Sequence, residues 1–210
     1  MKIAFVLYDK FTALDLVGPY EVLANWPDAE VHFVATSPGP IMADAGLIVS
    51  PTASPESIPD PDLVLVPGSS RPFGPLQDQA LLDWVKQAAE SATWMASVCT
   101  GATVYAAAGL LAGRRATTHW AARDVLAAMG AEVSTERVVF DDPFVSGAGV
   151  SAGIDMALAL TARIYGPDAA ETVQLAIEYD PQPPFDSGSP EKAGPVVVQR
   201  VLDRFAAALS

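Results

Sequence analysis

The sequence predicts an α/β fold in which a mainly parallel β-sheet lies between two layers of helices. Short apolar runs, typical of strands that are buried on both faces, alternate with longer segments of helical periodicity. The spacing between successive apolar runs leaves room for the crossover of about a dozen residues that parallel strands require. No internal repeat and no linker divides the chain, so we expect a single domain over residues 1–210.

In the first half of the chain, each expected strand is a short apolar run, and each expected helix carries apolar residues at spacings of three and four. Pro19 lies inside the first helix, where its missing N–H predicts a kink or a restart. Residues 37–61 are rich in proline and glycine and should hold a small hairpin around residues 46–49. The expected strands are residues 2–8, 31–35, 62–66 and 93–98, and the expected helices are residues 12–26, 77–92 and 102–108.

The second half repeats this alternation and ends in helices. A glycine, Gly130, is expected to end the first of them, and Asp168 is expected to cap another at its N-terminus. Two short strands should flank the turn at Asp141 and Asp142, and residues 180–195 form a Pro/Gly/Ser-rich excursion. The expected helices are residues 120–129, 149–165, 168–179 and 196–209, and the expected strands are residues 132–140 and 143–145.

Composition excludes several classes of protein. Twelve basic and 25 acidic side chains give a net charge of −13, which disfavours a nucleic-acid partner because phosphate contacts need basic residues. Half of the residues are hydrophobic, which excludes a disordered chain. No stretch has the length and apolarity of a signal peptide or a membrane span. The single cysteine, Cys99, indicates the reducing cytoplasm, and the two histidines show no metal-ligand spacing.

Cys99 is the most informative reactive residue. It follows the strand at residues 93–98 directly, and Gly101 and an alanine-rich helix come after it. This is the strand–nucleophile–helix order of a nucleophile elbow, with sulfur in place of oxygen. Such a turn exposes the side chain above the sheet, and the helix N-terminus should lower the pKa of the thiol. The alternative is a buried structural cysteine.

Three further positions accompany the cysteine. Gly68 and Ser69 end a neighbouring strand, where backbone N–H groups could form an anion hole, or only an ordinary turn. Asp15 lies between two leucines, an expensive place for a carboxylate unless it has a partner or a purpose, and the alternative is a helix cap. His119 is the only histidine after Cys99, and its alternative is a side chain satisfied near the surface.

Taken together, these segments resemble the PfpI-like superfamily of class I glutamine-amidotransferase-like folds, which includes the Parkinson-disease-associated deglycase. The resemblance covers nearly the whole chain and implies a flavodoxin-like three-layer sandwich with a nucleophile elbow. The segments that carry it are residues 11–23 (FTALDLVGPYEVL), 65–69 (LVPGS), 97–102 (SVCTGA), 115–120 (RATTHW) and 151–158 (SAGIDMAL).

The resemblance assigns roles to individual residues. It implies that Cys99 is the nucleophile and that Asp15 is its acidic partner, where the protease and deglycase branches carry glutamate. Thr100 stands where the protease branch carries histidine, which argues against proteolysis. Ser69 replaces a common second glycine but keeps its N–H group. The implied anion-hole and substrate-binding residues are Gly68, Ser69, Thr100 and Gly101.

Asp15 and Thr100 match the branch of the superfamily that hydrates isonitriles. That match implies addition of water to an isocyanide through a Cys99 thioimidate, with Asp15 as general acid and base, no metal, no organic cofactor and a homodimer. Two alternatives stay open: a glyoxalase or deglycase acting on 2-oxoaldehydes, and a non-catalytic redox or ligand sensor. An uncharged substrate needs an apolar pocket, for which the candidate walls are Tyr20, Phe73, His119, Trp120 and Phe140.

Overall fold

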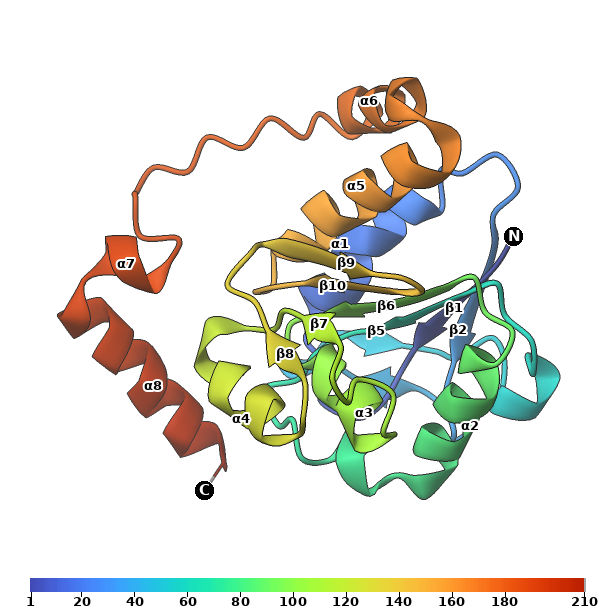
Figure 1. The fold of residues 1–210 in the computed structure, drawn as a ribbon, viewed down its shortest axis with the longest axis horizontal. Helices are drawn as coiled ribbons and strands as arrows, with labels where there is room; N and C mark the ends of the chain where they lie inside the picture. The colour runs from blue at the N-terminus through green and yellow to red at the C-terminus, as the bar shows by residue number, and fades with distance from the viewer. Residues whose placement is uncertain (210) are drawn as a thin grey trace.

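A six-stranded sheet with helices on both faces forms the centre of the molecule (Figure 1). The computed structural model describes the backbone of residues 1–209 and the side chains of residues 1–206. The strand order is β2-β1-β5-β6-β10-β9, and every neighbouring pair is parallel except β10 and β9. The sheet strands are β1 (Lys2–Val6), β2 (Glu30–Val34), β5 (Leu63–Val66), β6 (Trp94–Val98), β9 (Val138–Asp141) and β10 (Phe144–Gly147).

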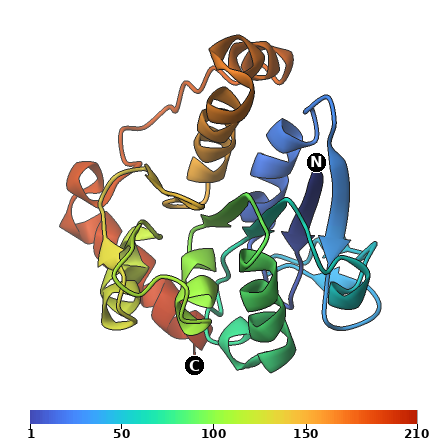
Figure 2. The ribbon, with the colours of Figure 1, turned by 45° about the vertical axis from the view of Figure 1, so that its right-hand side comes forward.

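The helices form one layer on each face of this sheet (Figures 1 and 2). One layer holds α1 and α5, which pack on each other, and the other holds α2 and α3. The chain then extends from α6 to α7 and α8, which lies beside the α4 side of the molecule. The helices are α1 (Ala13–Leu23), α2 (Gln79–Ala89), α3 (Gly101–Ala107), α4 (Arg123–Ala128), α5 (Ala152–Tyr165), α6 (Pro167–Ala176), α7 (Pro190–Ala193) and α8 (Pro195–Leu209).

The register of β5 and β6 brings two of the predicted site segments together. Val66 pairs with Ser97 in parallel register, so the two strands end at the same edge of the sheet. The chain therefore leaves the sheet at Gly68 and at Cys99 side by side. This edge is where ligands bind in open α/β sheets, and no other strand pair separates the two turns.

Most of the predicted elements are confirmed, and the core strands are the clearest cases. All four residues of β5 and all five of β6 are buried, as their continuous apolar sequences predict. The predicted hairpin is also present, because β3 (Ile41–Met42) pairs antiparallel with β4 (Ile48–Val49). α2 is shorter than predicted because Asp78 caps it, accepting a hydrogen bond from the Leu81 N–H at 3.0 Å.

Other predictions were wrong in detail. Residues 132–140 are two strands rather than one, since β8 (Glu132–Val133) leaves the main sheet to pair with β7 (Arg115–Ala116). Asp168 does not cap α6: Gly166 is the N-cap, and Asp168 lies in the first turn, beside the positive end of the helix dipole. α1 continues through Pro19 as one helix, so the helix does not restart there.

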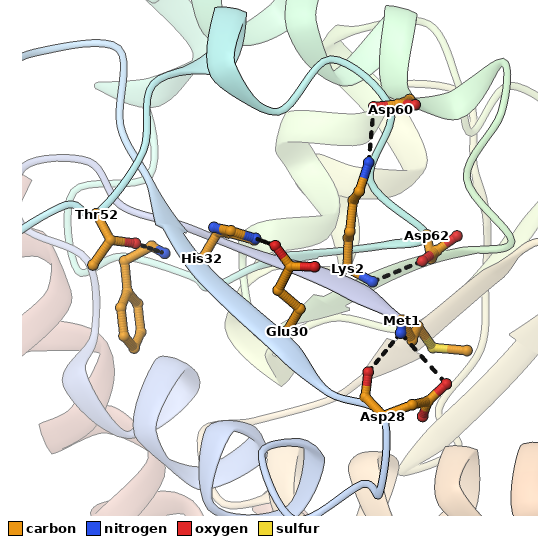
Figure 3. Close-up of polar contacts among 9 residues, drawn as sticks. Met1, Lys2, Asp28, Glu30, His32, Thr52, Asp60 and Asp62 are labelled. Carbon is orange, nitrogen blue, oxygen red and sulfur yellow. Dashed lines mark hydrogen bonds and ion pairs between the residues drawn. The ribbon is translucent and has the colours of Figure 1, made fainter.

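His32 and a group of ion pairs lie near β2, the strand at one side of the sheet. His32 lies on the edge strand β2, where its Nε2 is 3.0 Å from Glu30 Oε1 (Figure 3). Around it, the N-terminal ammonium group pairs with Asp28, and Lys2 pairs with Asp60. These contacts hold the starts of the strands, so they are structural and lie outside the candidate site. Across residues 1–209, none of the helices combines the length and apolar character that crossing a bilayer demands.

Candidate active site

The turn at Cys99 has the geometry of a nucleophile elbow. Cys99 follows β6 and precedes α3, and its φ of 57° lies in the left-handed region, a conformation that costs a non-glycine residue about 1–2 kcal/mol. Two hydrogen bonds hold it: the Cys99 N–H donates to Gly147 O at 3.0 Å, and Thr118 Oγ1 donates to Cys99 O at 2.7 Å. The fold therefore holds this one cysteine in a strained turn, and strain of this kind is concentrated at functional sites.

Two glycines allow the neighbouring backbones to approach the elbow. A Cβ at Gly101 would lie only 2.1 Å from the carbonyl oxygen of Val66. A Cβ at Gly68 would lie 2.7 Å from Asp15 Oδ2 and 2.8 Å from the Cβ of Cys99. No side chain fits at either position. The space that a methyl group would fill at Gly68 is thus bordered by both proposed catalytic side chains.

Asp15 is fully buried in the first turn of α1. Its Oδ2 accepts a hydrogen bond from the Gly68 N–H at 2.9 Å, and its Oδ1 is buried without a partner. Burial raises the pKa of Asp15 to about 8, and the Gly68 N–H and Cys99 oppose that rise only in part. Asp15 therefore holds a proton at neutral pH, as its apolar flanks predict.

The thiol of Cys99 behaves differently from the prediction. Burial raises the pKa of Cys99 well above its ordinary value, and the negative charge of Asp15 raises it further. The Thr100 N–H and hydroxyl act in the opposite direction but do not overcome the burial. The prediction of a lowered pKa was wrong because it counted the helix N-terminus and left out the loss of solvent. Before substrate enters, both Cys99 and Asp15 are neutral at pH 7.

The backbone N–H groups of the predicted anion hole already donate hydrogen bonds within the protein. The Gly68 N–H is bonded to Asp15, and the Ser69 N–H donates to Thr100 Oγ1 at 2.8 Å. The same hydroxyl donates back to Ser69 O at 3.2 Å. Neither N–H group is free to receive a substrate anion. Gly68 and Thr100 instead position the acid and the elbow, and the Thr100 N–H faces the sulfur of Cys99.

Cys99 opens into a cavity of about 260 Å³. Cys99, Thr100 and Ser69 form its polar inner end, and of the predicted walls Phe73 and His119 line it. Burial lowers the pKa of His119, and the charge of Arg123 lowers it further, so the ring is neutral at pH 7. The remaining lining residues are Thr12, Asp44, Ser70, Pro72, Leu76, Thr103, Ala121, Ala122, Val125, Val150 and Phe205, most of them apolar.

Three predicted walls lie elsewhere. Tyr20 packs in the core between the rings of Phe5 and Phe33, on the α1 face of the sheet. Phe140 meets Trp94 edge to face at the start of β6, the strand end opposite the elbow. Trp120 contacts the ring of His119 but faces α7 and α8 instead of the cavity. The sequence shows that these rings are apolar but not which side of the sheet they occupy.

Two residues outside the predicted site also act on it: Tyr8, which follows the first strand, and Asp44. The Tyr8 hydroxyl donates to Pro67 O, and burial followed by the charges of Asp15 and Cys99 raises the pKa of Tyr8 well above its ordinary value. Asp44, in the turn of the β3–β4 hairpin, accepts a hydrogen bond from Thr12 Oγ1 at 2.9 Å. Its charge also raises the pKa of Asp15. No local sequence pattern distinguishes Asp44 from an ordinary turn aspartate.

Comparison with known proteins decides the family. The model of the DJ-1/PfpI family matches residues 1–163. This chain belongs to the DJ-1/PfpI family. The resemblance inferred from the five sequence segments is therefore confirmed, and so is the fold: fission-yeast DJ-1 (Schizosaccharomyces pombe) superposes with a TM-score of 0.74 over 87% of this chain and all of its own, at 15% identity.

Relatives with higher identity span all or most of this chain. Isonitrile hydratase of Pseudomonas putida is 45% identical over 100% of this chain and 92% of its own length. A ThiJ/PfpI family protein from Pseudomonas syringae superposes with a TM-score of 0.93, at 37% identity, over 99% of this chain and 86% of that one. The transcriptional regulator CdhR of Pseudomonas aeruginosa is 32% identical over 80% of this chain, which matches 52% of the regulator.

Proposed function

We propose that this protein is an isonitrile hydratase, which adds water to R–N≡C and releases the N-substituted formamide. The observation that carries the proposal is the pairing of a cysteine on a strained elbow with a buried, protonated aspartic acid. An isonitrile carbon must gain both a nucleophile and a proton, and Cys99 and Asp15 supply one each. The full-length similarity to an isonitrile hydratase supports the same reaction.

The first step forms a covalent thioimidate. Cys99 Sγ attacks the terminal carbon of the isonitrile, and Asp15 donates its proton to that carbon. The thiol proton passes to the carboxylate in return, which leaves R–N=CH–S–Cys99 and a neutral Asp15. Burial helps this exchange, because the raised pKa of Asp15 keeps the proton in place until the carbon develops negative charge.

The second step hydrates the thioimidate. Asp15 donates a proton to the nitrogen and accepts one from the attacking water, whose oxygen bonds to the same carbon. The C–S bond then breaks, the hydroxyl proton returns to sulfur through Asp15, and R–NH–CHO leaves. The net reaction consumes one isonitrile and one water. Thr100 assists as sulfur departs, because its N–H and hydroxyl stabilise negative charge on Cys99.

The cavity suits an uncharged, apolar R group. Phe73, Leu76 and Val125 are among its apolar lining residues, and Phe73 and Val125 are also exposed to solvent. Asp44 also lines it, and His119 is neutral at pH 7, so a carboxylate on the substrate would find repulsion and no cationic partner there. The reactive carbon is thereby directed toward the sulfur and the R group away from it.

A direct assay tests the proposal. Purified protein is given p-nitrophenyl isocyanide, and N-(4-nitrophenyl)formamide is followed by chromatography, with Cys99→Ala as the control. Formamide from the native protein alone is the expected result. A parallel incubation with methylglyoxal tests the glyoxalase alternative: lactate without formamide would replace our proposal. Absence of both products, with Cys99 oxidised by mild peroxide, would favour a sensor.

We further propose that residues 1–210 act as one domain, that the protein is a cytoplasmic homodimer, and that no cofactor takes part. One contiguous hydrophobic core supports the single domain. Large apolar side chains on the surface support the dimer: Leu175 is 80% exposed and Phe185 is 78% exposed. A reducing compartment keeps the single thiol available. Light scattering after size-exclusion chromatography tests the dimer, and a monomer mass would refute it.

A further inference from the structure

The C-terminal helix α8 reaches the active-site cavity through one side chain. Within the described part of α8, the less exposed residues include Val198, Val201 and Phe205, spaced three and four apart along one stripe. Val198 and Val201 line a small cavity together with Trp120, and Phe205 lines the cavity that holds Cys99. Of the twenty-one helices and strands in the described chain, α8 is the last, so a distant part of the sequence completes this wall.

The ring of Phe205 packs against the ring of His119. The two rings meet edge to face, with centroids 5.3 Å apart and planes at 82°. His119 is itself held, because its Nδ1 accepts a hydrogen bond from the Ala121 N–H at 3.3 Å. Gly149 backs the ring closely: a Cβ there would lie 3.3 Å from His119 Cδ2. Phe205 therefore packs on a ring that is itself held in place.

The described side chains of α8 contact the rest of the protein by apolar packing, without polar links. Among the side chains described in residues 195–206, the hydrogen bond from Gln199 Nε2 to Asp203 Oδ1 stays within the helix, and no ion pair or hydrogen bond links a side chain of α8 to the rest of the protein. Replacing Phe205 thus removes an apolar wall without breaking a polar network. Cys99 and Thr100, at the inner end of the cavity, lie in the turn between β6 and α3, so that end is built independently of α8.

We propose that Phe205 determines specificity: its ring closes the outer part of the cavity and sets the largest substituent that can reach Cys99. As a statement about isonitriles the inference rests on the proposed function, with compact R groups accepted and extended ones rejected. As a statement about access to the sulfur it stands without that function. Apolar pockets discriminate by size in this way because added groups must either fit or displace the wall.

Alkylation of the only thiol in the chain tests access directly. N-methylmaleimide and N-(1-pyrenyl)maleimide add to sulfur by the same reaction and differ only in the substituent. Intact-mass spectrometry gives both rate constants, and their ratio cancels any change in thiolate fraction. We expect Phe205→Ala to raise the pyrenyl-to-methyl ratio by about tenfold or more. Phe205→Tyr, which keeps the ring, should leave the ratio near that of the native protein.

Leu202→Ala is the matched control, because Leu202 is on the same helix, is 38% exposed and does not line the cavity. It should leave the ratio unchanged. An unchanged ratio in Phe205→Ala, or an equal rise in Leu202→Ala, overturns the inference. Phe205→Leu provides a second test if the alanine variant does not fold, and should raise the ratio by a smaller factor.

The same variants are then assayed with 4-biphenylyl and methyl isocyanide. A rise in relative kcat/KM for the larger isocyanide in Phe205→Ala is the expected result, and a ratio unchanged from the native protein counts against the inference. If the native protein hydrates neither compound while the alkylation ratio shifts, the proposed function fails and the role of Phe205 in access to Cys99 stands. The two failures are thus distinguishable.

Discussion

The backbone N–H of Gly68 donates a 2.9 Å hydrogen bond to Oδ2 of Asp15. This bond joins the end of β5 to the first turn of α1, 53 residues apart in the chain. Because Gly68 has no side chain, it also lies against the elbow at Cys99. One residue therefore holds the buried acid and leaves it facing the thiol, and the predictions below follow from that arrangement.

Cys99→Ala is expected to abolish formamide production, because no other thiol exists in the chain to form the thioimidate. The change removes only the sulfur and leaves the backbone hydrogen bonds of the turn in place, so the fold should persist. Product formation is measured by chromatography and folding by circular dichroism. Retention of turnover in a folded Cys99→Ala protein would contradict the covalent route.

Asp15→Asn should lower kcat by roughly 10²–10⁴-fold, the usual contribution of a general acid or base. The amide retains an oxygen for the Gly68 N–H but has no proton to give to carbon. In the native protein, kcat/KM should fall as pH rises through about 8, where Asp15 loses its proton. Steady-state rates between neutral and alkaline pH measure both effects, and a rate that increases across that range would argue against a protonated Asp15.

The same carboxyl should make stability depend on pH. The folded pKa of Asp15, about 8, lies above its ordinary value of 3.8, so the unfolded chain ionises first as pH rises. The folded state then binds more protons, and the free energy of unfolding should fall by up to about 1.4 kcal/mol per pH unit between the two values. Urea unfolding at several pH values measures this slope. Asp15→Asn should flatten it, and an identical slope in both proteins would refute the assignment.

Gly68→Ala should both destabilise the protein and reduce activity. The added methyl group would lie 2.6 Å from the Thr100 nitrogen and 2.7 Å from Asp15 Oδ2, so the backbone must move. Overpacking of this kind costs about 1–3 kcal/mol. Gly188→Ala is the control, because nothing lies within 4 Å of a Cβ there and its φ is not in the left-handed region. Thermal unfolding compares the two, and equal melting temperatures would count against the close approach at Gly68.

Thr100→Val should disturb the elbow, and Thr100→Ser should not. Valine leaves the buried Ser69 N–H without an acceptor, which should lower the free energy of unfolding by about 1–3 kcal/mol. It also removes a hydroxyl that stabilises the Cys99 thiolate. The pKa of Cys99 should rise further, so N-methylmaleimide should react more slowly at a fixed pH. The dependence of the alkylation rate on pH measures this change in the pKa of Cys99. A profile that is unchanged in the valine variant would show that the hydroxyl does not act on the sulfur.

The order of strands and helices was predictable because it depends on local patterns. The continuous apolar runs at β5 and β6 indicate strands buried on both faces, and only helical crossovers of the observed length can connect them in parallel. The elbow was also predictable, since a strand that runs into Cys99 and then Gly101 leaves the chain one sharp turn. Asp15 was identified because a carboxylate among leucines requires a special environment.

The remaining features depend on contacts between distant segments, which no local pattern encodes. The sequence by itself determined the α/β fold and pointed to Cys99 as the candidate nucleophile and Asp15 as the candidate acid. Only the tertiary structure decided that the Gly68 N–H is occupied by Asp15, that burial outweighs the helix N-terminus in setting the pKa of Cys99, and that Phe205 of α8 lines the cavity. The physical reason is that desolvation and hydrogen-bond pairing arise when the layers close around a residue, whereas periodicity acts along the chain.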